Sequence, residues 1–262
     1  MRVQPGLMLA AWSEDEHARS TLWSRPLDDR GWRRTQPIDS VGGAINSLDL
    51  ASAGRGLALA TWYEASPPSG GPIFANLFDG ASGWGGRQQI GSAGTFPVAG
   101  VDASGRALVV WNTHDGLMMN RFIPESGWTG EAKGPGAGNP FQVRLAVGAS
   151  GRSLAAWRDE NALWGASYDP STGWSAARQL SLSPSGTAQV VVDASGRGVV
   201  VWGENGSVIA QTYVPATGWG RPERVGPSGS NLAAGIDAQG NVTVVWNGND
   251  ILFSRLAMGQ LP

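Results

Sequence analysis

Hydrophobic and polar positions alternate in short blocks along this chain, and one block recurs from end to end. A short apolar run ends in tryptophan at intervals of 44 to 50 residues. These tryptophans are Trp12, Trp62, Trp111, Trp157, Trp202 and Trp246. A Gly-Trp pair follows the first five of them, at Trp32, Trp84, Trp128, Trp174 and Trp219. A repeat of this length written in short strands predicts an array of small β-sheets.

The third repeat shows the pattern within one unit most clearly. Val98–Asp102 is a predicted strand of small residues, and Asp102–Arg106 is a tight turn in which Gly105 supplies a positive φ. Ala107–Trp111 is continuously apolar, which indicates burial on both faces of a sheet. Leu117–Ile123 is a third strand, and the segment after the next Gly-Trp pair is a short polar fourth strand.

Four strands per repeat, with small residues on the first and polar residues on the last, predict the blade of a β-propeller. We therefore expect a single all-β domain with six four-stranded blades. The repeats cover approximately residues 1–42, 43–94, 95–138, 139–184, 185–229 and 230–262. The first and last blades are expected to be incomplete, because only Met1–Val3 precedes the first Trp-ended strand and the last repeat stops after its third strand. The alternative is a piece of a longer propeller.

Two motifs carry a resemblance to a known group of proteins. Asp-Ala-x-Gly followed by an apolar run and Val-Trp occurs at Asp193–Trp202, and Tyr-x-Pro-x-x-Gly-Trp occurs at Tyr168–Trp174 and Tyr213–Trp219. In these motifs the chain resembles bacterial, mostly exported β-propeller repeat proteins, over nearly its whole length. The group has no single assigned function. The resemblance implies an extracytoplasmic location.

The amino-acid composition excludes several classes of binding partner. The net charge is −2 and only 15% of the residues are charged, which argues against nucleic acid or an anionic membrane as the main partner. No apolar run approaches the ~20 residues of a membrane span, so no membrane insertion is expected. The absence of cysteine excludes disulfides and cysteine-based metal sites. The protein could be one part of a larger polypeptide.

The tryptophans invite two interpretations. They could be stacking platforms for sugars, or they could fill the wedge between neighbouring blades, where each would bury about 150–250 Å². Because eleven of the thirteen fall at repeated positions, we expect those eleven to be structural. Trp23 and Trp164 lie outside the repeated positions, in predicted third strands, and are better candidates for ligand contact.

The Asp-x-x-Gly turns at Asp102, Asp193 and Asp237 could suggest calcium. Calcium needs six to eight clustered oxygens, whereas each turn offers one carboxylate, so we expect structural turns. The turns also lack the aromatic residue that follows directly in a sialidase-type Asp-box. The paired Arg and Glu of the fucose-binding lectin propellers do not recur either. The sequence predicts no metal and no cofactor.

The loops between second and third strands share one face of a propeller. Here they contain both histidines and nine of the 21 acidic residues. We therefore expect one composite binding site on this polar loop face, since binding commonly sits on loops held by a rigid scaffold. The alternative is that short β-turns are simply polar. The candidate residues, with the two off-pattern tryptophans, are Glu16, His17, Trp23, Asn112, His114, Asp115, Asp159, Glu160, Trp164, Glu204, Asn205 and Asn247.

These observations favour a non-catalytic binding module that recognises a glycan or a protein through the loop face. One alternative is a carbohydrate-active hydrolase or lyase, in which Glu16 would pair with Asp115 or Glu160 as acid and base. The other is a structural spacer. No catalytic residue is predicted, because neither histidine has an assignable Ser or Asp partner.

Overall fold

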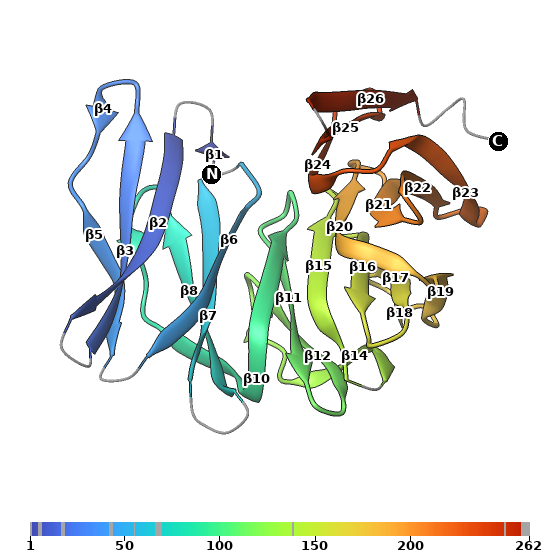
Figure 1. The fold of residues 1–262 in the computed structure, drawn as a ribbon. Coiled ribbons are helices and arrows are strands. Elements are labelled where there is room, and N and C mark those ends of the chain that lie inside the picture. The colour runs from blue at the N-terminus through green and yellow to red at the C-terminus, as the bar shows by residue number, and fades with distance from the viewer. Residues whose placement is uncertain are drawn as a thin grey trace. The chain divides into compact units, whose positions relative to one another are not determined.

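The computed structural model describes residues 2–4, 7–16, 19–41, 44–54, 56–65, 70–137, 139–248 and 250–257. The chain divides into two compact units, Met1–Gly134 (unit 1) and Pro135–Pro262 (unit 2). Every regular element of the described part is a β-strand (Figure 1). No helix there has the length and apolar character needed to cross a membrane.

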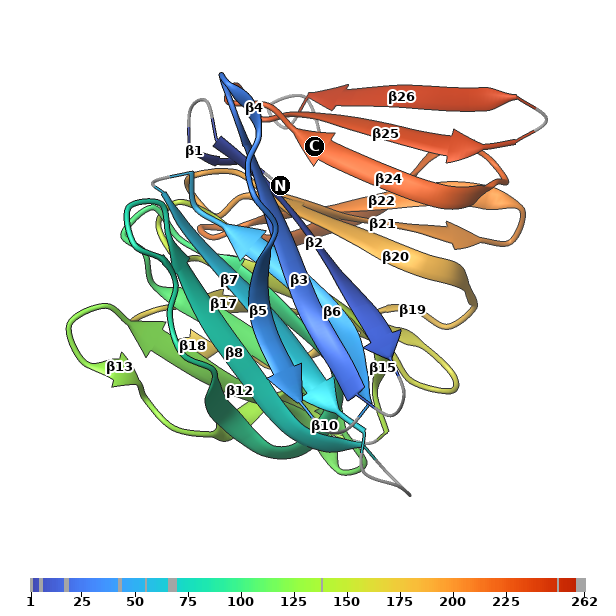
Figure 2. The same ribbon diagram turned by 90° about the vertical axis from the view of Figure 1, so that its left-hand side faces the viewer.

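Unit 1 contains three antiparallel sheets. The strands of the first sheet are β1 (Arg2–Gln4), β2 (Leu7–Glu16), β3 (Arg19–Asp28), β4 (Gly31–Trp32) and β5 (Gln36–Val41). Those of the second are β6 (Ile45–Ser52), β7 (Leu57–Glu64), β8 (Gly71–Asp79), β9 (Gly83–Trp84) and β10 (Gln88–Val101). The third sheet adds β11 (Ala107–Thr113), β12 (Gly116–Ile123), β13 (Gly127–Trp128) and β14 (Ala132–Ala137). In the first sheet β3 lies between β2 and β5 (Figure 2).

Unit 2 repeats the same plan. The fourth sheet has β15 (Phe141–Val147), β16 (Ser153–Arg158), β17 (Leu163–Asp169), β18 (Gly173–Trp174) and β19 (Arg178–Ser181). The fifth has β20 (Pro184–Val192), β21 (Gly198–Glu204), β22 (Ser207–Val214) and β23 (Gly218–Pro227). The sixth has β24 (Ser230–Ile236), β25 (Asn241–Asn247) and β26 (Ile251–Ala257). The described residues give six sheets when the two halves of β10 are counted separately, with a three-residue inner strand in the first and three strands in the last, as predicted.

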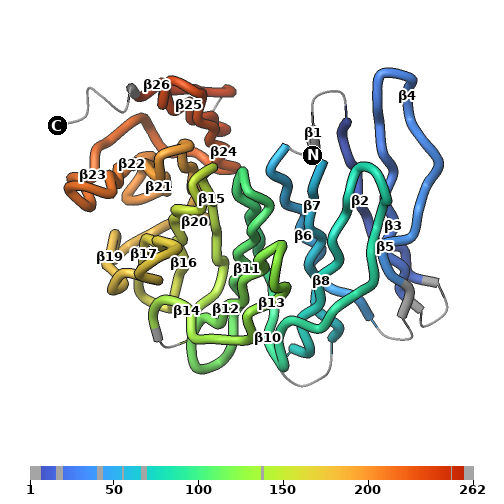
Figure 3. The backbone as a smooth tube through the Cα atoms, turned by 180° about the vertical axis from the view of Figure 1, so that it is seen from behind, coloured from blue at the N-terminus to red at the C-terminus, as the bar shows by residue number. Residues whose placement is uncertain are grey.

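One strand serves two sheets. Residues 88–94 of β10 pair with β8 as the outer strand of the second sheet. Residues 95–101 of the same strand pair with β11 as the inner strand of the third sheet. The sequence pattern predicted two separate strands here, whereas β10 runs without a break from Gln88 to Val101 and bulges at Phe96, whose φ is 49°. Figure 3 shows the course of the backbone.

The tryptophan that ends each second strand is buried in five of the six sheets, and four of these five pack between neighbouring sheets of the same unit, as predicted. Trp62, Trp111, Trp157, Trp202 and Trp246 are at most 2% exposed. Trp12, at the same repeat position, is only half-buried, and its indole Nε1 donates a hydrogen bond to Glu14 Oε1. The repeated apolar strand is therefore a core element.

The tryptophans of the Gly-Trp pairs are structural, as expected. Each of four packs against the aromatic residue at the end of the preceding strand, with ring centroids 5.1 to 5.5 Å apart. These four are half-buried, and Trp32 is 52% exposed. Two of them also bond to the neighbouring sheet, since Trp84 Nε1 donates to Ser24 Oγ and Trp128 Nε1 donates to Gln88 Oε1.

The aspartate turns are structural, as predicted. In each, the Asp Oδ1 atom accepts hydrogen bonds from the backbone N–H groups two and four residues later, at Asp102, Asp193 and Asp237. Gly105, Gly196 and Gly240 have φ of 82°, 91° and 83°. Among the described residues no group of three or more His, Asp or Glu could hold a metal ion.

Asp193 should make stability depend on pH. Burial raises the pKa of its carboxyl group, but hydrogen bonds from Ser195 and Arg197 outweigh this and hold the pKa below its usual value. Because the folded-state pKa is depressed, the stabilisation is present above about pH 4 and is lost as the pH falls through the folded pKa. We expect Asp193→Asn to lower the free energy of unfolding by about 1 kcal/mol at pH 7. In urea titrations the difference should vanish toward pH 3, and exposed Asp29→Asn should show no such difference at either pH.

Candidate functional site

The hairpins between second and third strands define a loop face in each unit. In unit 2 the hairpin β16–β17 closes at Arg158 and Leu163. The inner strand of the same sheet begins at this end, because Phe141 pairs with Arg158. The same holds in the other two sheets, where Pro184 pairs with Glu204 and Ser230 pairs with Asn247. The loop face of unit 2 therefore carries both the hairpins and the first residues of β15, β20 and β24.

A cavity of about 700 Å³ opens among these three inner strands. We call it the inner-strand hollow. Its lining consists of one guanidinium, two side-chain amides, hydroxyls and bare backbone, with a single large apolar residue. The lining residues are Arg144, Ser185, Gly186, Thr187, Gln189, Gly229, Ser230, Asn231 and Leu232.

A second cavity, of about 620 Å³, adjoins the hollow on the same face. It shares Gly229 and Ser230 with the hollow and extends to Asn247 and Asp250 of the sixth sheet. The two cavities together place amide, hydroxyl, guanidinium and carboxylate groups along one continuous surface of unit 2.

A repeated backbone irregularity shapes the hollow. Each inner strand of unit 2 shifts register near its start, where Gln142, Gly186 and Asn231 have φ of 52°, 66° and 51°. Such a bulge redirects side chains, and a non-glycine residue in this conformation costs of order 1–3 kcal/mol. Arg158 Nη1 donates to Gly186 O at 3.2 Å and holds the bulge of the neighbouring sheet.

The polar groups of the hollow are available for a ligand. The Arg144 guanidinium donates one bond, from Nη1 to Val143 O at 3.1 Å. The side-chain amides of Gln189 and Asn231 bond to no other residue of the described part. Arg144 and Gln189 are half-buried and Asn231 is exposed. Side-chain donors and acceptors without protein partners favour a ligand that supplies hydroxyls.

Several predicted site residues support the fold instead. Asp159 Oδ2 accepts a hydrogen bond from Trp164 Nε1 at 2.6 Å, and its Oδ1 accepts from the N–H groups of Asn161 and Ala162. Burial raises the pKa of Asp159, but these hydrogen bonds outweigh it and leave the pKa below its usual value. Glu204 Oε2 likewise accepts from Trp202 Nε1 at 2.8 Å. These carboxylates satisfy indole N–H groups.

The other predicted residues are scattered. Asn112 lies in strand β11, 4% exposed, and not in the loop that the sequence predicted; its buried Oδ1 has no hydrogen-bond partner. His114, Asp115, Glu160 and Asn205 are exposed in turns, and Trp23 is half-buried opposite Trp12. Glu16 and His17 were expected in a loop between the second and third strands, but β2 runs to Glu16 and β3 begins at Arg19. His17 and the side chain of Glu16 lie outside the described residues. Asn247 lines a cavity.

Sequence reasoning missed Arg144, Gln189 and Asn231. It treated the first strand of each repeat as a strand of small residues and searched the loops. A signal was present, because Arg144 and Gln189 occupy the position that holds Val98 in the third sheet and Ala233 in the sixth. The second sheet has Asp49 at this position, so three of the five aligned inner strands carry a polar side chain where the third and sixth carry an apolar one.

Comparisons with known proteins establish the fold. No protein-family model and no curated protein matches the sequence. Among solved structures the chain is similar to an α-L-arabinanase of Penicillium chrysogenum complexed with arabinobiose, at TM-score 0.56 and 14% identity, covering 100% of this chain and 93% of that one. It is similar to the Hadza microbial sialidase Hz136, at TM-score 0.57 and 10% identity, covering 99% of this chain and only 65% of the sialidase. It is also similar to a fucose-specific lectin from Aleuria aurantia, at TM-score 0.50 and 14% identity, covering 99% of this chain and 94% of the lectin.

The six sheets and these likenesses define the class of protein: the chain is an all-β propeller with six blades, the first and last of them incomplete. At these identities the similarity concerns the fold alone.

Proposed function

We propose that the protein is a glycan-binding module that holds its ligand in the inner-strand hollow of unit 2. The observation that carries the proposal is the set of unpartnered amides of Gln189 and Asn231 beside the Arg144 guanidinium, in a cavity of about 700 Å³. Ligand cavities commonly measure ~300–1,000 Å³ and orient the ligand with a few polar groups. Sugars offer the hydroxyls that such groups recognise.

Two further observations support a sugar over a protein ligand. The arabinanase, the sialidase and the fucose-specific lectin are each named for a carbohydrate. Phe141 begins the same strand that carries Arg144, is 36% exposed, and has the Arg158 guanidinium over its ring at 5.6 Å from the centroid. Sugars present both hydroxyls and an apolar ring face.

Binding of a glycan in the hollow would cost little conformational entropy. The lining residues are on strands, and the bulges that orient them are fixed by pairing within each sheet. A ligand docking there immobilises few additional side chains, so more of the contact energy remains as affinity.

Five carboxylates have a pKa that does not suit a general acid. A general acid needs a raised pKa near the working pH. Asp28, Asp159, Asp169, Asp193 and Asp237 have a pKa shifted downward. The hydrolase alternative needs Glu16 paired with Asp115 or Glu160; Asp115 and Glu160 are exposed, and the side chain of Glu16 lies outside the described residues. It draws on the likeness to an arabinanase and a sialidase.

A glycan array tests the proposal. Labelled protein should bind a subset of oligosaccharides, and Arg144→Ala should weaken the strongest of these by about tenfold, as expected for the loss of a hydrogen bond to a charged donor. Arg221→Ala, which removes an exposed arginine from β23, is the matched control and should leave binding unchanged.

Two outcomes would contradict the proposal. One is an array pattern to which Arg144→Ala and Arg221→Ala respond alike. The other is release of product from chromogenic glycosides at a rate that falls in Glu160→Gln, which would establish the hydrolase instead.

A further inference from the structure

The fourth blade differs from the third and fifth blades at two neighbouring positions. In the third, fifth and sixth blades the turn after the inner strand opens with aspartate, at Asp102, Asp193 and Asp237. The fourth blade has Gly148 there. Its third strand, β17, ends in Asp169, as β3 and β8 end in aspartate, whereas β12 and β22 end in the apolar Ile123 and Val214. The fourth blade thus lacks the turn carboxylate and has a carboxylate at the end of the adjacent strand.

As a result, the turn arginine of the fourth blade bonds to a different carboxylate from that of the fifth. In the fifth blade Arg197 Nε donates to Asp193 Oδ2, within its own turn, at 2.7 Å. Arg152 occupies the same turn position in the fourth blade, and its Nε donates instead to Asp169 Oδ2 at 2.8 Å. The side chain crosses Gly196 of the fifth blade, where a Cβ atom would lie 2.6 Å from Cβ of Arg152 and 2.8 Å from its Cδ. Arg152 is therefore held between the two blades.

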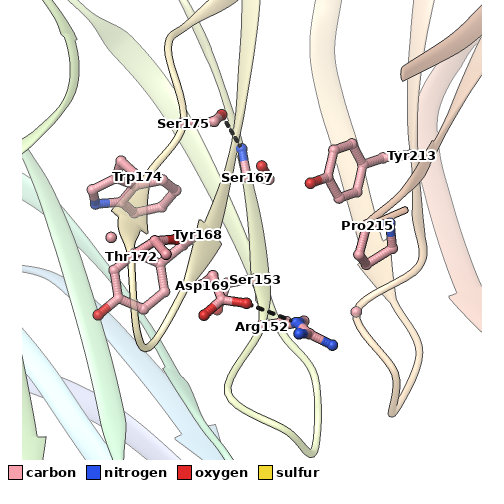
Figure 4. Close-up of a pocket in the computed structure, with 12 residues that line it drawn as sticks. Arg152, Ser153, Ser167, Tyr168, Asp169, Thr172, Trp174, Ser175, Tyr213 and Pro215 are labelled. Atoms are coloured by element: carbon pink, nitrogen blue, oxygen red, sulfur yellow. Dashed lines mark hydrogen bonds and ion pairs between the residues drawn. The ribbon is translucent and has the colours of Figure 1, made fainter. Parts of the chain in front are cut away.

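At this point the structure has a cavity of about 390 Å³, the interblade pocket. Figure 4 shows Trp174 and Tyr168 of the fourth blade on one side and Tyr213 and Pro215 of the fifth blade on the other. Arg152 and Asp169 lie between them (Figure 4). Four hydroxyl side chains complete the lining: Ser153, Ser167, Thr172 and Ser175.

The charged side chains that line the interblade pocket, Arg152 and Asp169, have opposite charges and sum to zero. The Ser171 hydroxyl and the Arg152 guanidinium donate hydrogen bonds to Asp169 and lower its pKa to about 2, so this carboxylate is ionised at neutral pH. The Asp169 and Arg152 charges offset each other at 2.8 Å. Both terminal nitrogens of Arg152 remain without a hydrogen bond to any described residue.

We propose that the interblade pocket is a second binding site, which takes the pyranose ring of a neutral glycoside. The aromatic walls suit the apolar face of such a ring, and the Arg152 terminal nitrogens and the hydroxyls suit its hydroxyl groups. The size is within the ~300–1,000 Å³ of small-molecule sites. The pocket lies at the ends of the strands opposite the loop face, because Ser153 pairs with Tyr168 and the hairpin lies beyond Arg158. The proposal does not depend on the inner-strand hollow.

The test follows the indole N–H signal of Trp174 by NMR, assigned with Trp174→Phe, during titration with the methyl α-pyranosides of glucose, galactose, mannose and fucose. We expect at least one of them to shift this signal. Arg152→Ala should weaken that binding about tenfold. Arg197→Ala is the matched control, since this arginine has the same turn position but pairs within its own turn. It should leave the affinity unchanged.

Two further variants keep the outcome decisive. Arg152→Lys retains the charge but lacks the planar fork that can hold Asp169 and a sugar hydroxyl together, so it should also weaken binding even if Arg152→Ala folds poorly. Arg144→Ala should leave the Trp174 titration unchanged, which separates this site from the hollow. The proposal is overturned if no pyranoside shifts the Trp174 signal, or if the folded Arg152 and Arg197 variants bind equally.

Discussion

Replacing Trp157 with alanine is expected to lower the free energy of unfolding by about 3–5 kcal/mol, the range for large-to-small changes of aromatic residues in a core. The side chain is 2% exposed. It packs so closely against Gly136 that a Cβ atom at that glycine would lie 2.6 Å from Cζ2 of Trp157. Since the surrounding strands are fixed by sheet pairing, the site cannot collapse around the missing ring. Urea denaturation followed by far-UV circular dichroism measures the loss.

Trp32→Ala is the matched control for this prediction. It removes the same side chain from a Gly-Trp pair, where the ring is 52% exposed and lies under the Arg25 guanidinium. Its cost should stay below about 1 kcal/mol. Equal losses in the two variants would mean that the strand-end tryptophan is not the wedge between blades.

Gly91→Ala should destabilise the protein by about 1–3 kcal/mol, because the added methyl group would overlap buried side chains that are already closely packed. The new Cβ would lie 2.6 Å from Cζ2 of Trp111 and 3.1 Å from Cγ1 of Ile73. Both neighbours are fully buried, so neither can move away cheaply.

Gly86→Ala provides the comparison for the glycine prediction. Nothing lies within 4 Å of a Cβ at Gly86. This change should be neutral or stabilising by up to about 1 kcal/mol, through a smaller entropy of the unfolded chain. Thermal or urea unfolding of the two alanine variants distinguishes them; similar stabilities would remove the packing role assigned to Gly91.

The sequence predicted the architecture well because the same strand pattern recurs six times, so a strand that is unclear in one repeat can be assigned from the others. The strands predicted at Ala107–Trp111 and Leu117–Ile123 are observed as β11 and β12, extended by two residues and one residue. The hairpin between them is tighter than predicted, because Thr113 pairs with Gly116. Similarly, Ser13–Glu16 lack an apolar alternation, so the pattern could not show that β2 continues through them.

The candidate site was harder to predict, for two physical reasons. Polar loop residues such as Asp159 and Glu204 bond to indole N–H groups, a contact that depends on side-chain direction and not on spacing. The hollow depends on bulges whose left-handed residues include Gln142, a residue type that gives no sign of that conformation. Asn231 is the exception, since asparagine is enriched there.

The repeat therefore explains the scaffold, and its departures carry the proposed chemistry. Arg144 and Gln189 stand where the third and sixth sheets have Val98 and Ala233, and Asp169 stands where β12 and β22 end in apolar residues. None of these three is needed to pack a blade. Each adds hydrogen-bonding capacity beside a cavity.

The central claim is that a saccharide binds in the inner-strand hollow of unit 2. The most direct measurement is a crystal structure of the protein soaked with the oligosaccharide that binds most strongly on the array. The account predicts electron density for sugar hydroxyls within hydrogen-bond distance of Arg144, Gln189 and Asn231. Density for the sugar only at other places on the protein, with the hollow empty, would contradict it.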